Sequence, residues 1–402
     1  MRTLQKSWWC GLALCAVVSL RGLSAQEAPA PPPEWAAALP GWVYRFPADH
    51  LVHPDYKTEW WYFTGNLHDD AGRAYGYELT FFRQGTIPPA RLATLFADGG
   101  THSRFVQGDF KFAHFAVTDL AGRKFHFTQR MTRGAFGEAG FGTVANEPLA
   151  YLEDWHLDPQ PDGSWRIAAH ADAPTPMSID LEIRPEKEPV AHGAEGVSQK
   201  AAGLGNASHY YSFTRLATAG MLSLGQGAAP AKVRGTSWFD HEWASNQLAA
   251  DQVGWDWFCY QFDDRTELML YAMRRRDGTV DPVSAGTFVD ADGRTTHLER
   301  GDFRLDAARS WTSKQTQATY PLAWQVKIPR LEMEFTSESS LDDQELVLPP
   351  ISYWEGATRA QGKRAGKAVA GVGYMELTGY AGALKGLQKP SAAEENLRLP
   401  PR

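Results

Sequence analysis

Three ionisable side chains follow one another between two tryptophans in the segment 237–243, SWFDHEW. If this segment is a strand, alternate side chains share a face, so Asp240 and Glu242 point one way with Trp238, and His241 points the other way. Burial among tryptophans raises the pKa of a carboxyl group, and a nearby imidazole opposes that rise. This balance is how a general acid or base is tuned. The other interpretation is a structural ion pair that fixes the end of a strand.

Two more acidic side chains lie in aromatic segments far away in the sequence. Glu59 leads into the aromatic run Trp-Trp-Tyr at 60–62, where an acid either caps neighbouring backbone or lines a cavity. In the segment 371–380, GVGYMELTGY, Glu376 alternates onto one face with Tyr374. A glutamate that faces inward among tyrosines is expected to be a polar anchor in an aromatic pocket.

The chain carries none of the common sequence signals of metal or cofactor enzymes. Asp, His and Glu are acceptable metal ligands, but the sequence has no HExxH motif and no set of cysteine ligands. It also has no phosphate-binding loop, no dinucleotide fingerprint and no GxSxG nucleophile motif. We therefore predict that the protein uses no metal and no cofactor.

Composition narrows the classes of function further. The 402 residues carry a net charge of -7 and contain no basic tract, so we predict no nucleic-acid partner. Fifteen tryptophans indicate large cores or an aromatic-lined cavity. Cys10 and Cys15 fall in the amino-terminal apolar segment, and Cys259 is expected to be a buried packing residue rather than a nucleophile.

The first 25 residues are typical of a removable secretory signal. Arg2 and Lys6 precede an uncharged apolar run at 8–20, and small residues at 23–25 suit cleavage. The run is shorter than the roughly 20 residues that a membrane span needs, although an uncleaved anchor is the alternative. We expect a protein that is exported to the periplasm or secreted, with no transmembrane segment in its mature chain.

The rest of the chain is typical of many short strands joined by hairpins. Alternating apolar runs end at Gly, Asp or Pro, a pattern found in β-barrels and sandwiches. Helices are expected to be few, with one at 88–96. A faint repeat relates residues 60–69 to residues 255–264 and, unless it is chance, indicates two related β domains. The predicted divisions are a signal peptide at 1–25, a Pro/Ala-rich linker at 26–40, an N-terminal domain at 41–228, a C-terminal domain at 229–382 and a disordered tail at 383–402.

Four segments in order carry a family resemblance: TEWWYFTGNL at 58–67, SWFDHEWASNQL at 237–248, WDWFCYQFDD at 255–264 and GVGYMELTGY at 371–380. They resemble the AttH-like proteins, which are often labelled secreted hydrolases. More distantly, they are similar to carotenoid 1,2-hydratases and to fungal lipocalin-like Diels–Alderases. The resemblance implies an all-β fold of two tandem lipocalin-like antiparallel β-barrel domains with few helices, and such barrels hold an apolar ligand.

The resemblance also implies a chemistry. In the hydratase relatives, an acid is thought to protonate a carbon–carbon double bond, and water then adds to the cation. The Asp-His-x-Trp element of those enzymes corresponds to Asp240, His241 and Trp243, and tryptophan faces can stabilise a developing cation. The further acid of the hydratases falls in the region of Asp256, Asp263 and Asp264.

We predict a protein that binds an apolar small molecule or lipid and acts on it by acid/base hydration or hydrolysis. The predicted catalytic residues are Asp240, His241 and Glu242, with Asp240 and His241 as the acid/base pair. The predicted ligand-binding residues are Glu59, Trp60, Trp61, Tyr62, Trp238, Trp243, Trp255, Asp256, Trp257, Tyr260, Tyr374, Glu376 and Tyr380. One alternative is a non-catalytic carrier in which residues 240–242 hold the two barrels together. Another is an accessory protein that serves an envelope transport partner and chaperones apolar cargo.

Overall fold

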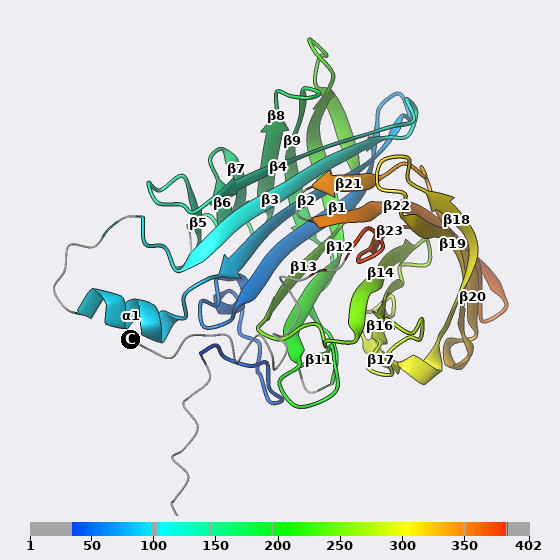
Figure 1. Ribbon diagram of the computed structural model, residues 1–402. Coiled ribbons are helices and arrows are strands. Elements are labelled where there is room, and N and C mark those ends of the chain that lie inside the picture. Colours follow the sequence, from blue (N-terminus) through cyan, green and yellow to red (C-terminus); the bar gives the residue numbers. More distant parts are fainter. Residues whose placement is uncertain are drawn as a thin grey trace, which may run out of the picture. The chain divides into compact units, whose positions relative to one another are not determined.

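Antiparallel strands make up most of the described chain (Figure 1). The structure is a computed structural model, and it describes residues 34–97, 103, 105–144, 147–194, 196–348, 351–382 and 384. The predicted signal peptide, the linker up to residue 33 and all of the predicted tail except residue 384 lie outside the described residues.

The first sheet contains thirteen described strands. They are β1 (Thr58–Asp69), β2 (Ala74–Gly85), β3 (Asp109–Asp119), β4 (Lys124–Thr132), β5 (Ala139–Phe141), β6 (Ala150–Leu152), β7 (Trp155–Pro159), β8 (Trp165–Ala171), β9 (Met177–Pro185), β10 (Val190–Ala191), β11 (Ser198–Gln199), β12 (Ala207–Leu224) and β13 (Ala231–Ala244). Their order across the sheet is β4-β3-β2-β1-β13-β12-β9-β8-β7-β6-β5, and β10 and β11 also pair with β12.

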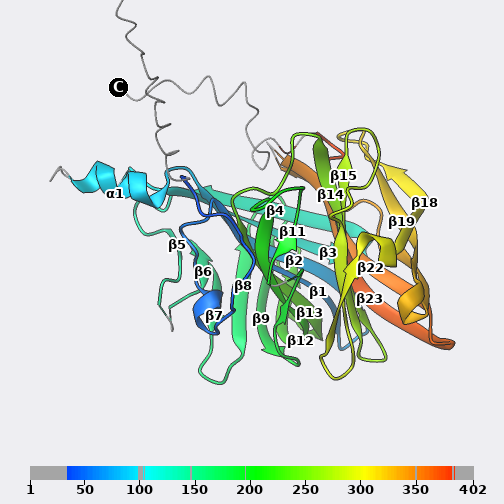
Figure 2. The same cartoon turned by 90° about the horizontal axis from the view of Figure 1, so that it is seen from below.

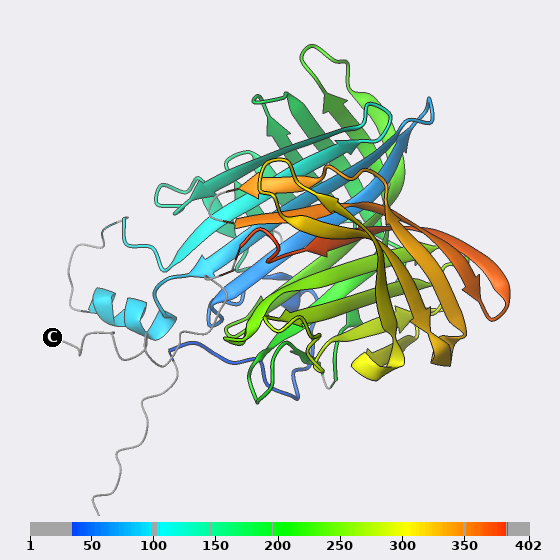
Figure 3. The ribbon, with the colours of Figure 1, turned by 45° about the vertical axis from the view of Figure 1, so that its right-hand side comes forward.

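The second sheet contains ten described strands and curls around a core of its own (Figure 3). They are β14 (Gln252–Phe262), β15 (Glu267–Arg275), β16 (Ala285–Val289), β17 (Thr295–Glu299), β18 (Arg304–Thr312), β19 (Thr319–Ile328), β20 (Met333–Ser339), β21 (Glu345–Leu348), β22 (Ile351–Arg364) and β23 (Lys367–Leu377). Their order is β17-β16-β15-β14-β23-β22-β20-β19-β18, and β21 pairs with β22.

Helices are few in the described part of the chain, as predicted. The α-helix α1 (Pro89–Ala97) lies where one was expected, and three short 3₁₀ turns are η1 (Ala48–His50), η2 (Arg300–Asp302) and η3 (Pro329–Leu331). Within the described residues, no helix combines the length and the apolar character needed to cross a membrane.

The two sheets repeat one arrangement of strands. In each sheet, four strands follow one another as a meander, β1 to β4 or β14 to β17. The last strand of each sheet, β13 or β23, then pairs beside the first strand of that meander. The similar sequence segments 60–69 and 255–264 fall mainly on β1 and β14, which hold equivalent positions. The predicted all-β fold of two tandem lipocalin-like antiparallel β-barrel domains with few helices is therefore confirmed.

The change of sheet comes one strand later than the domain boundary predicted at 228–229. That boundary falls in the hairpin between β12 and β13, and both of these strands belong to the first sheet. β13 completes this sheet because it pairs with β1 on one side and with β12 on the other. The chain passes to the second sheet only at residues 245–251.

Side chains from both sheets meet in a buried cluster that includes Tyr62, Trp238, Trp257 and Tyr374. Strand β1 contacts β23, and β2 contacts β22, in this region (Figure 2). Polar contacts also join the sheets: the Asn66 side chain of β1 donates to the Gly373 carbonyl of β23 at 3.1 Å. The residues that form this junction are those of the aromatic segments singled out in the sequence.

The β1–β13 pair that carries these segments has no room for an extra methyl group at Gly235. A Cβ atom at this position would lie 2.0 Å from the carbonyl oxygen of Asn66. Gly235→Ala should therefore lower the free energy of unfolding by about 1–3 kcal/mol, measured by urea denaturation. Gly301→Ala is the control, because a Cβ atom there would meet nothing within 4 Å. Equal stability of the two variants would contradict this strand pairing.

Candidate functional site

A cavity of about 390 Å³ lies between the two sheets. Its size falls in the range of small-molecule binding sites, and its wall is mostly apolar. Strands β1, β2, β3, β4 and β13 contribute from the first sheet, and β14, β15, β21, β22 and β23 contribute from the second. The aromatic part of the wall includes Trp60, Phe82, Phe112, Trp255, Trp257 and Tyr271.

The triplet 240–242 is divided between the two faces of β13. Asp240 and Glu242 line the cavity. His241 lies on the opposite face, where it is fully buried and its ring stacks on Trp61 at 4.5 Å between ring centroids. The predicted alternation along the strand is thus confirmed. The predicted acid/base pair of Asp240 and His241 is not formed, because successive side chains of a strand point to opposite faces.

Asp240 is the best-supported acid in the cavity. Its Oδ1 accepts hydrogen bonds from the Trp238 indole at 2.6 Å and from the Ser212 hydroxyl. Its Oδ2 accepts one from the Tyr210 hydroxyl at 2.8 Å. Burial raises the pKa of Asp240 to about 7, although these three donors favour the ionised form. Near neutral pH the group is therefore able to give or to take a proton.

A buried chain of polar groups leads from Asp240 to the second sheet. The Ser212 hydroxyl lies 2.6 Å from His192 Nε2, and His192 Nδ1 lies 2.8 Å from the Thr287 hydroxyl on β16. Burial lowers the pKa of His192 well below its ordinary value, so its imidazole is neutral. A hydroxyl or a neutral imidazole can both donate and accept. These hydrogen bonds tie Asp240 to the second sheet.

Glu242, the other carboxylate of β13 in the cavity, forms an ion pair with Lys200 at 2.9 Å. The Lys200 ammonium also lies over the rings of Tyr271 and Tyr210, at 4.4 and 5.0 Å from their centroids. Burial lowers the pKa of Lys200, but Glu242, Tyr271 and Asp240 together outweigh this effect and the net shift is upward. Lys200 is therefore charged, and its charge is balanced by Glu242.

The second sheet brings two more carboxyl groups to the cavity. Glu355 of β22 accepts a hydrogen bond from Tyr62, and Glu376 of β23 accepts one from the Trp255 indole at 3.0 Å. Burial raises the pKa of Glu376 to about 7. Burial also raises the pKa of Glu355 well above its ordinary value, and the neighbouring Glu78 adds to this rise.

Asp240 and Glu376 occupy equivalent places in the two halves. Asp240 is paired across the sheet with Tyr62 of β1, and Glu376 is paired with Trp257 of β14. Tyr62 and Trp257 are themselves equivalent in the repeated segment. The repeat therefore places one acid from each half in the same cavity.

About half of the predicted ligand-binding residues line the cavity. They are Glu59, Trp60, Tyr62, Trp255, Trp257 and Glu376. The others do not: Trp61 and Trp243 lie in the first core, Tyr260 lies in the second core, and Trp238 and Tyr374 pack in the cluster between the sheets. Asp256 and Tyr380 also lie elsewhere, because Asp256 pairs with Arg274 at 2.9 Å and accepts from Tyr380 at 3.0 Å. Most of these differences follow from the alternation of side chains along a strand.

Sequence reasoning missed several polar residues of the cavity. Lys200 lies in a Gly- and Ala-rich stretch with no motif of its own. Glu355 and Tyr353 lie in the segment 351–357, ISYWEGA. This segment is aromatic like the four segments that carry the family resemblance, and that similarity is the sequence signal that could have identified both residues. The Tyr353 hydroxyl lies 2.7 Å from His114 Nδ1 on the other sheet.

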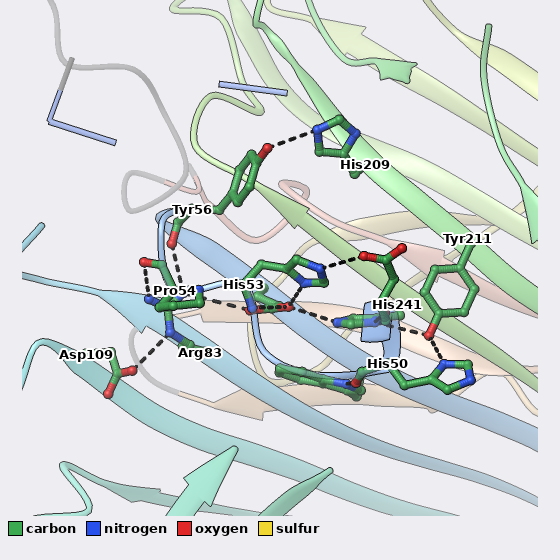
Figure 4. Close-up of polar contacts among 12 residues, drawn as sticks. His50, His53, Pro54, Tyr56, Arg83, Asp109, His209, Tyr211 and His241 are labelled. Atoms are coloured by element: carbon green, nitrogen blue, oxygen red, sulfur yellow. Dashed lines mark hydrogen bonds and ion pairs between the residues drawn. The ribbon is translucent and has the colours of Figure 1, made fainter. Parts of the chain in front are cut away.

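His241 belongs to a second polar network on the other face of β13, which shares Glu59 with the cavity lining (Figure 4). Glu59 Oε1 lies 2.8 Å from His53 Nδ1 and 2.9 Å from His241 Nε2. The remaining ring nitrogens bond to Asp49: His53 Nε2 to its carboxylate at 3.3 Å and His241 Nδ1 to its carbonyl at 3.0 Å. The network ties the segment before β1 to the first sheet.

Three side chains of this network, His53, Glu59 and His241, are the group of described residues best suited to hold a metal ion. One ligand atom each from His53, Glu59 and His241 lies within 4.8 Å of the others. The nitrogen–oxygen distances to Glu59 are those of hydrogen bonds. The guanidinium of Arg83, 3.9 Å from Glu59, already brings a positive charge to the carboxylate. Hydrogen bonding therefore accounts for the arrangement, and we assign the network a structural role.

Comparison with known proteins gives concordant matches. The chain matches the model of a family described as AttH-like over residues 37–380. A crystal structure of a protein assigned as AttH from Nitrosomonas europaea is 32% identical, covers 86% of this chain and 99% of that one, and has a TM-score of 0.74. Kievitone hydratase from Nectria haematococca shares the fold at 16% identity, with a TM-score of 0.64 over 87% of this chain and 97% of the hydratase.

One curated protein is similar in sequence over part of its length. It is the dehydratase asqC of Emericella nidulans, which is 23% identical over 210 residues. The match covers 50% of this chain and 58% of the dehydratase. The chain therefore spans little more than half of that relative.

Proposed function

The chain belongs to the AttH-like family, as its four aromatic segments predicted, and from this premise we propose that it adds water to, or removes water from, an apolar small molecule. The observation that carries the proposal is Asp240: an acid whose pKa of about 7 suits proton transfer, at the wall of a mostly apolar cavity. Apolar surroundings hold the substrate, and the buried acid supplies the chemistry.

Hydration then follows from the groups around the cavity. Protonated Asp240 gives its proton to a carbon–carbon double bond of the substrate, and the Asp240 carboxylate that forms is stabilised by its three hydrogen-bond donors. The positive charge on the substrate is stabilised by aromatic faces such as those of Trp255 and Trp257. A water molecule adds to the cation and passes a proton to Glu376, so that one proton enters and one leaves. Dehydration is the same sequence in reverse.

The names of two relatives support this reaction class. Kievitone hydratase shares the fold, and asqC, a dehydratase, shares part of the sequence. Both names describe the gain or loss of water. We favour this chemistry over hydrolysis for that reason.

The test is direct conversion of apolar molecules. The purified protein is incubated with an extract of cell lipids in deuterated water, and the products are analysed by mass spectrometry. We expect products that have gained one water, with one deuterium bound to carbon, or products that have lost one water. If the protein binds lipids from the extract and converts none of them, it is a carrier and the catalytic proposal fails.

We also propose that the protein is exported, on the strength of the signal-like residues 1–25. The supporting result is a processed chain in the periplasmic or secreted fraction of the native host. Deletion of residues 2–25 should retain the protein in the cytoplasm. An unprocessed chain in the cytoplasm of cells that express the full sequence would contradict export.

A further inference from the structure

The cavity holds more carboxyl groups than proton transfer to one substrate requires. Besides Asp240, it is lined by Glu355 and Glu376, and Glu78 lies close enough to raise the pKa of Glu355. Among the described residues, no Lys, Arg or His side chain forms an ion pair with Glu355 or Glu376. Carboxyl groups in a buried apolar site are unfavourable unless they are paired or neutral.

The protein shows elsewhere how it surrounds a buried positive charge. Lys200 pairs with Glu242 at 2.9 Å and lies over the ring of Tyr271 at 4.4 Å. On the second sheet, Arg274 pairs with Asp256 at 2.9 Å and lies 3.7 Å from the ring centroid of Tyr380. Each cation thus has a carboxylate on one side and the face of a tyrosine on another, which combines ion pairing with a cation–π contact.

Carboxyl groups and aromatic rings also come together at Glu355 and Glu376. Here they line the cavity, and no basic side chain of the described residues pairs with either acid. Tyr62, Trp255, Trp257 and Tyr353 line the cavity together with both carboxyl groups. Tyr62 bonds directly to Glu355, and Trp255 bonds directly to Glu376. We propose that this part of the cavity binds an organic cation, a protonated amine or quaternary ammonium group carried on an apolar body.

The electrostatics favour a cation over an anion. A lysine and an arginine line the cavity, and each already has an acidic partner: Lys200 pairs with Glu242 at 2.9 Å, and Arg83 pairs with Asp109 at 3.0 Å. The ionisable groups that face or adjoin Glu355 and Glu376 are Glu78, Tyr62, Asp240, Glu242, Lys200, His114, Cys259, Tyr353 and Tyr374. Burial favours the neutral form of Glu355 and leaves Glu376 partly neutral near pH 7, and an incoming cation favours the ionised forms of both. Binding of a cation should therefore release protons.

The inference rests on the proposed function because both concern the molecule that occupies this cavity. The proposed function gives its reaction, and the inference gives its charge. It therefore narrows the substrate class to apolar amines. Binding can be measured without any turnover. The probes are octyltrimethylammonium, octanol and octanoate, which share an apolar chain and differ in charge.

We expect octyltrimethylammonium to bind at pH 7 about tenfold or more tightly than octanol, and octanoate to bind most weakly. Tryptophan fluorescence reports binding because Trp255 and Trp257 line the cavity. The dissociation constant for the cation should fall as pH rises through about 7, because Glu376 loses its proton there. Calorimetry in buffers of different ionisation enthalpy should detect the released protons. Equal affinity for octanol and the cation, or tighter binding of octanoate, would overturn the inference.

Substitutions of Glu355 and Glu376 test whether these two acids cause the preference for the cation. Glu355→Gln/Glu376→Gln imitates the neutral acids in size and charge, so it should fold, and it should lose the preference for the cation over octanol together with the proton release. Glu334→Gln is the matched control, because Glu334 is an exposed strand glutamate that pairs with Lys327 far from the cavity lining. A double variant that keeps the full cation preference would overturn the assignment. If the double variant does not fold, proton release by the wild type decides the question: its presence supports the inference and its absence refutes it.

The binding test is separable from the test of catalysis. A wild-type protein that converts neutral apolar molecules but shows no preference for the cation refutes this inference alone. A protein that prefers the cation, releases protons and converts nothing refutes the catalytic proposal alone.

Discussion

Asp240→Asn should lower kcat/KM by about 10²- to 10⁴-fold, the usual contribution of a general acid, with little change in substrate affinity. Asparagine has the same size: its Oδ1 can still accept from Trp238 and Ser212, and its amide NH2 can donate to the Tyr210 hydroxyl, but it has no acidic proton to give. The wild-type rate of hydration should fall on the acid side of pH 7, because water passes its proton to ionised Glu376. It should also fall as pH rises through about 7, because the reaction uses the protonated form of Asp240. This fall should be absent from the residual activity of the variant.

His241→Gln is the matched control, since His241 is the next residue on the same strand and lies on the opposite face. It should reduce stability and leave kcat/KM of the folded protein close to the wild-type value. An equal loss of activity in both variants at equal folded fraction would contradict the assignment of Asp240 as the acid.

Glu59→Gln should lower the free energy of unfolding by about 3–5 kcal/mol, as expected when one partner is removed from a buried ion-pair network. Glu59 is fully buried, and the network depends on its carboxylate because both His53 and His241 bond to it. Arg83, at 3.9 Å, would also lose its nearest negative charge in this network. Denaturant unfolding at pH 6 measures the difference.

The stability of the wild type and that of Glu59→Gln should depend differently on pH. Burial opposes the ionisation of Glu59, but His53 and His241 outweigh it and lower its pKa from 4.5 to about 2. The resulting stabilisation, about 3 kcal/mol, is present above pH 4.5 and is lost as pH falls toward 2. The variant should lack this component of the acid-side loss. Glu334→Gln, an exposed control, should change stability by less than about 1 kcal/mol. Parallel acid unfolding of Glu59→Gln and the wild type would contradict the role of Glu59.

The part of the site that could be predicted from sequence is the part set by short-range geometry. A strand alternates its side chains, so the separation of Asp240 and Glu242 from His241 followed from the segment 237–243 alone. The repeat of β1 in β14 was visible because aromatic residues of a sheet junction keep a recognisable order. These features depend on neighbours in the chain.

Features that depend on which strands meet could not be predicted. Lys200 reaches the cavity from the turn between β11 and β12, and its ion-pair partner Glu242 lies 42 residues away in the sequence. Strand β13 completes the first sheet, although a Gly- and Pro-rich turn before it resembles a domain linker. Adjacency in sequence suggests Asp240 as the partner of His241, whereas its side-chain partner is Glu59 on another strand.

The equivalent places of Asp240 and Glu376 have an evolutionary consequence. In a symmetric homodimer, every substitution appears twice, so two related positions cannot diverge. Two similar halves in one chain are free of that constraint. Here one position carries a short acid held by three donors, and the other carries a longer acid bonded to Trp255. An architecture with two similar halves permits two equivalent positions to take up different tasks within a single cavity.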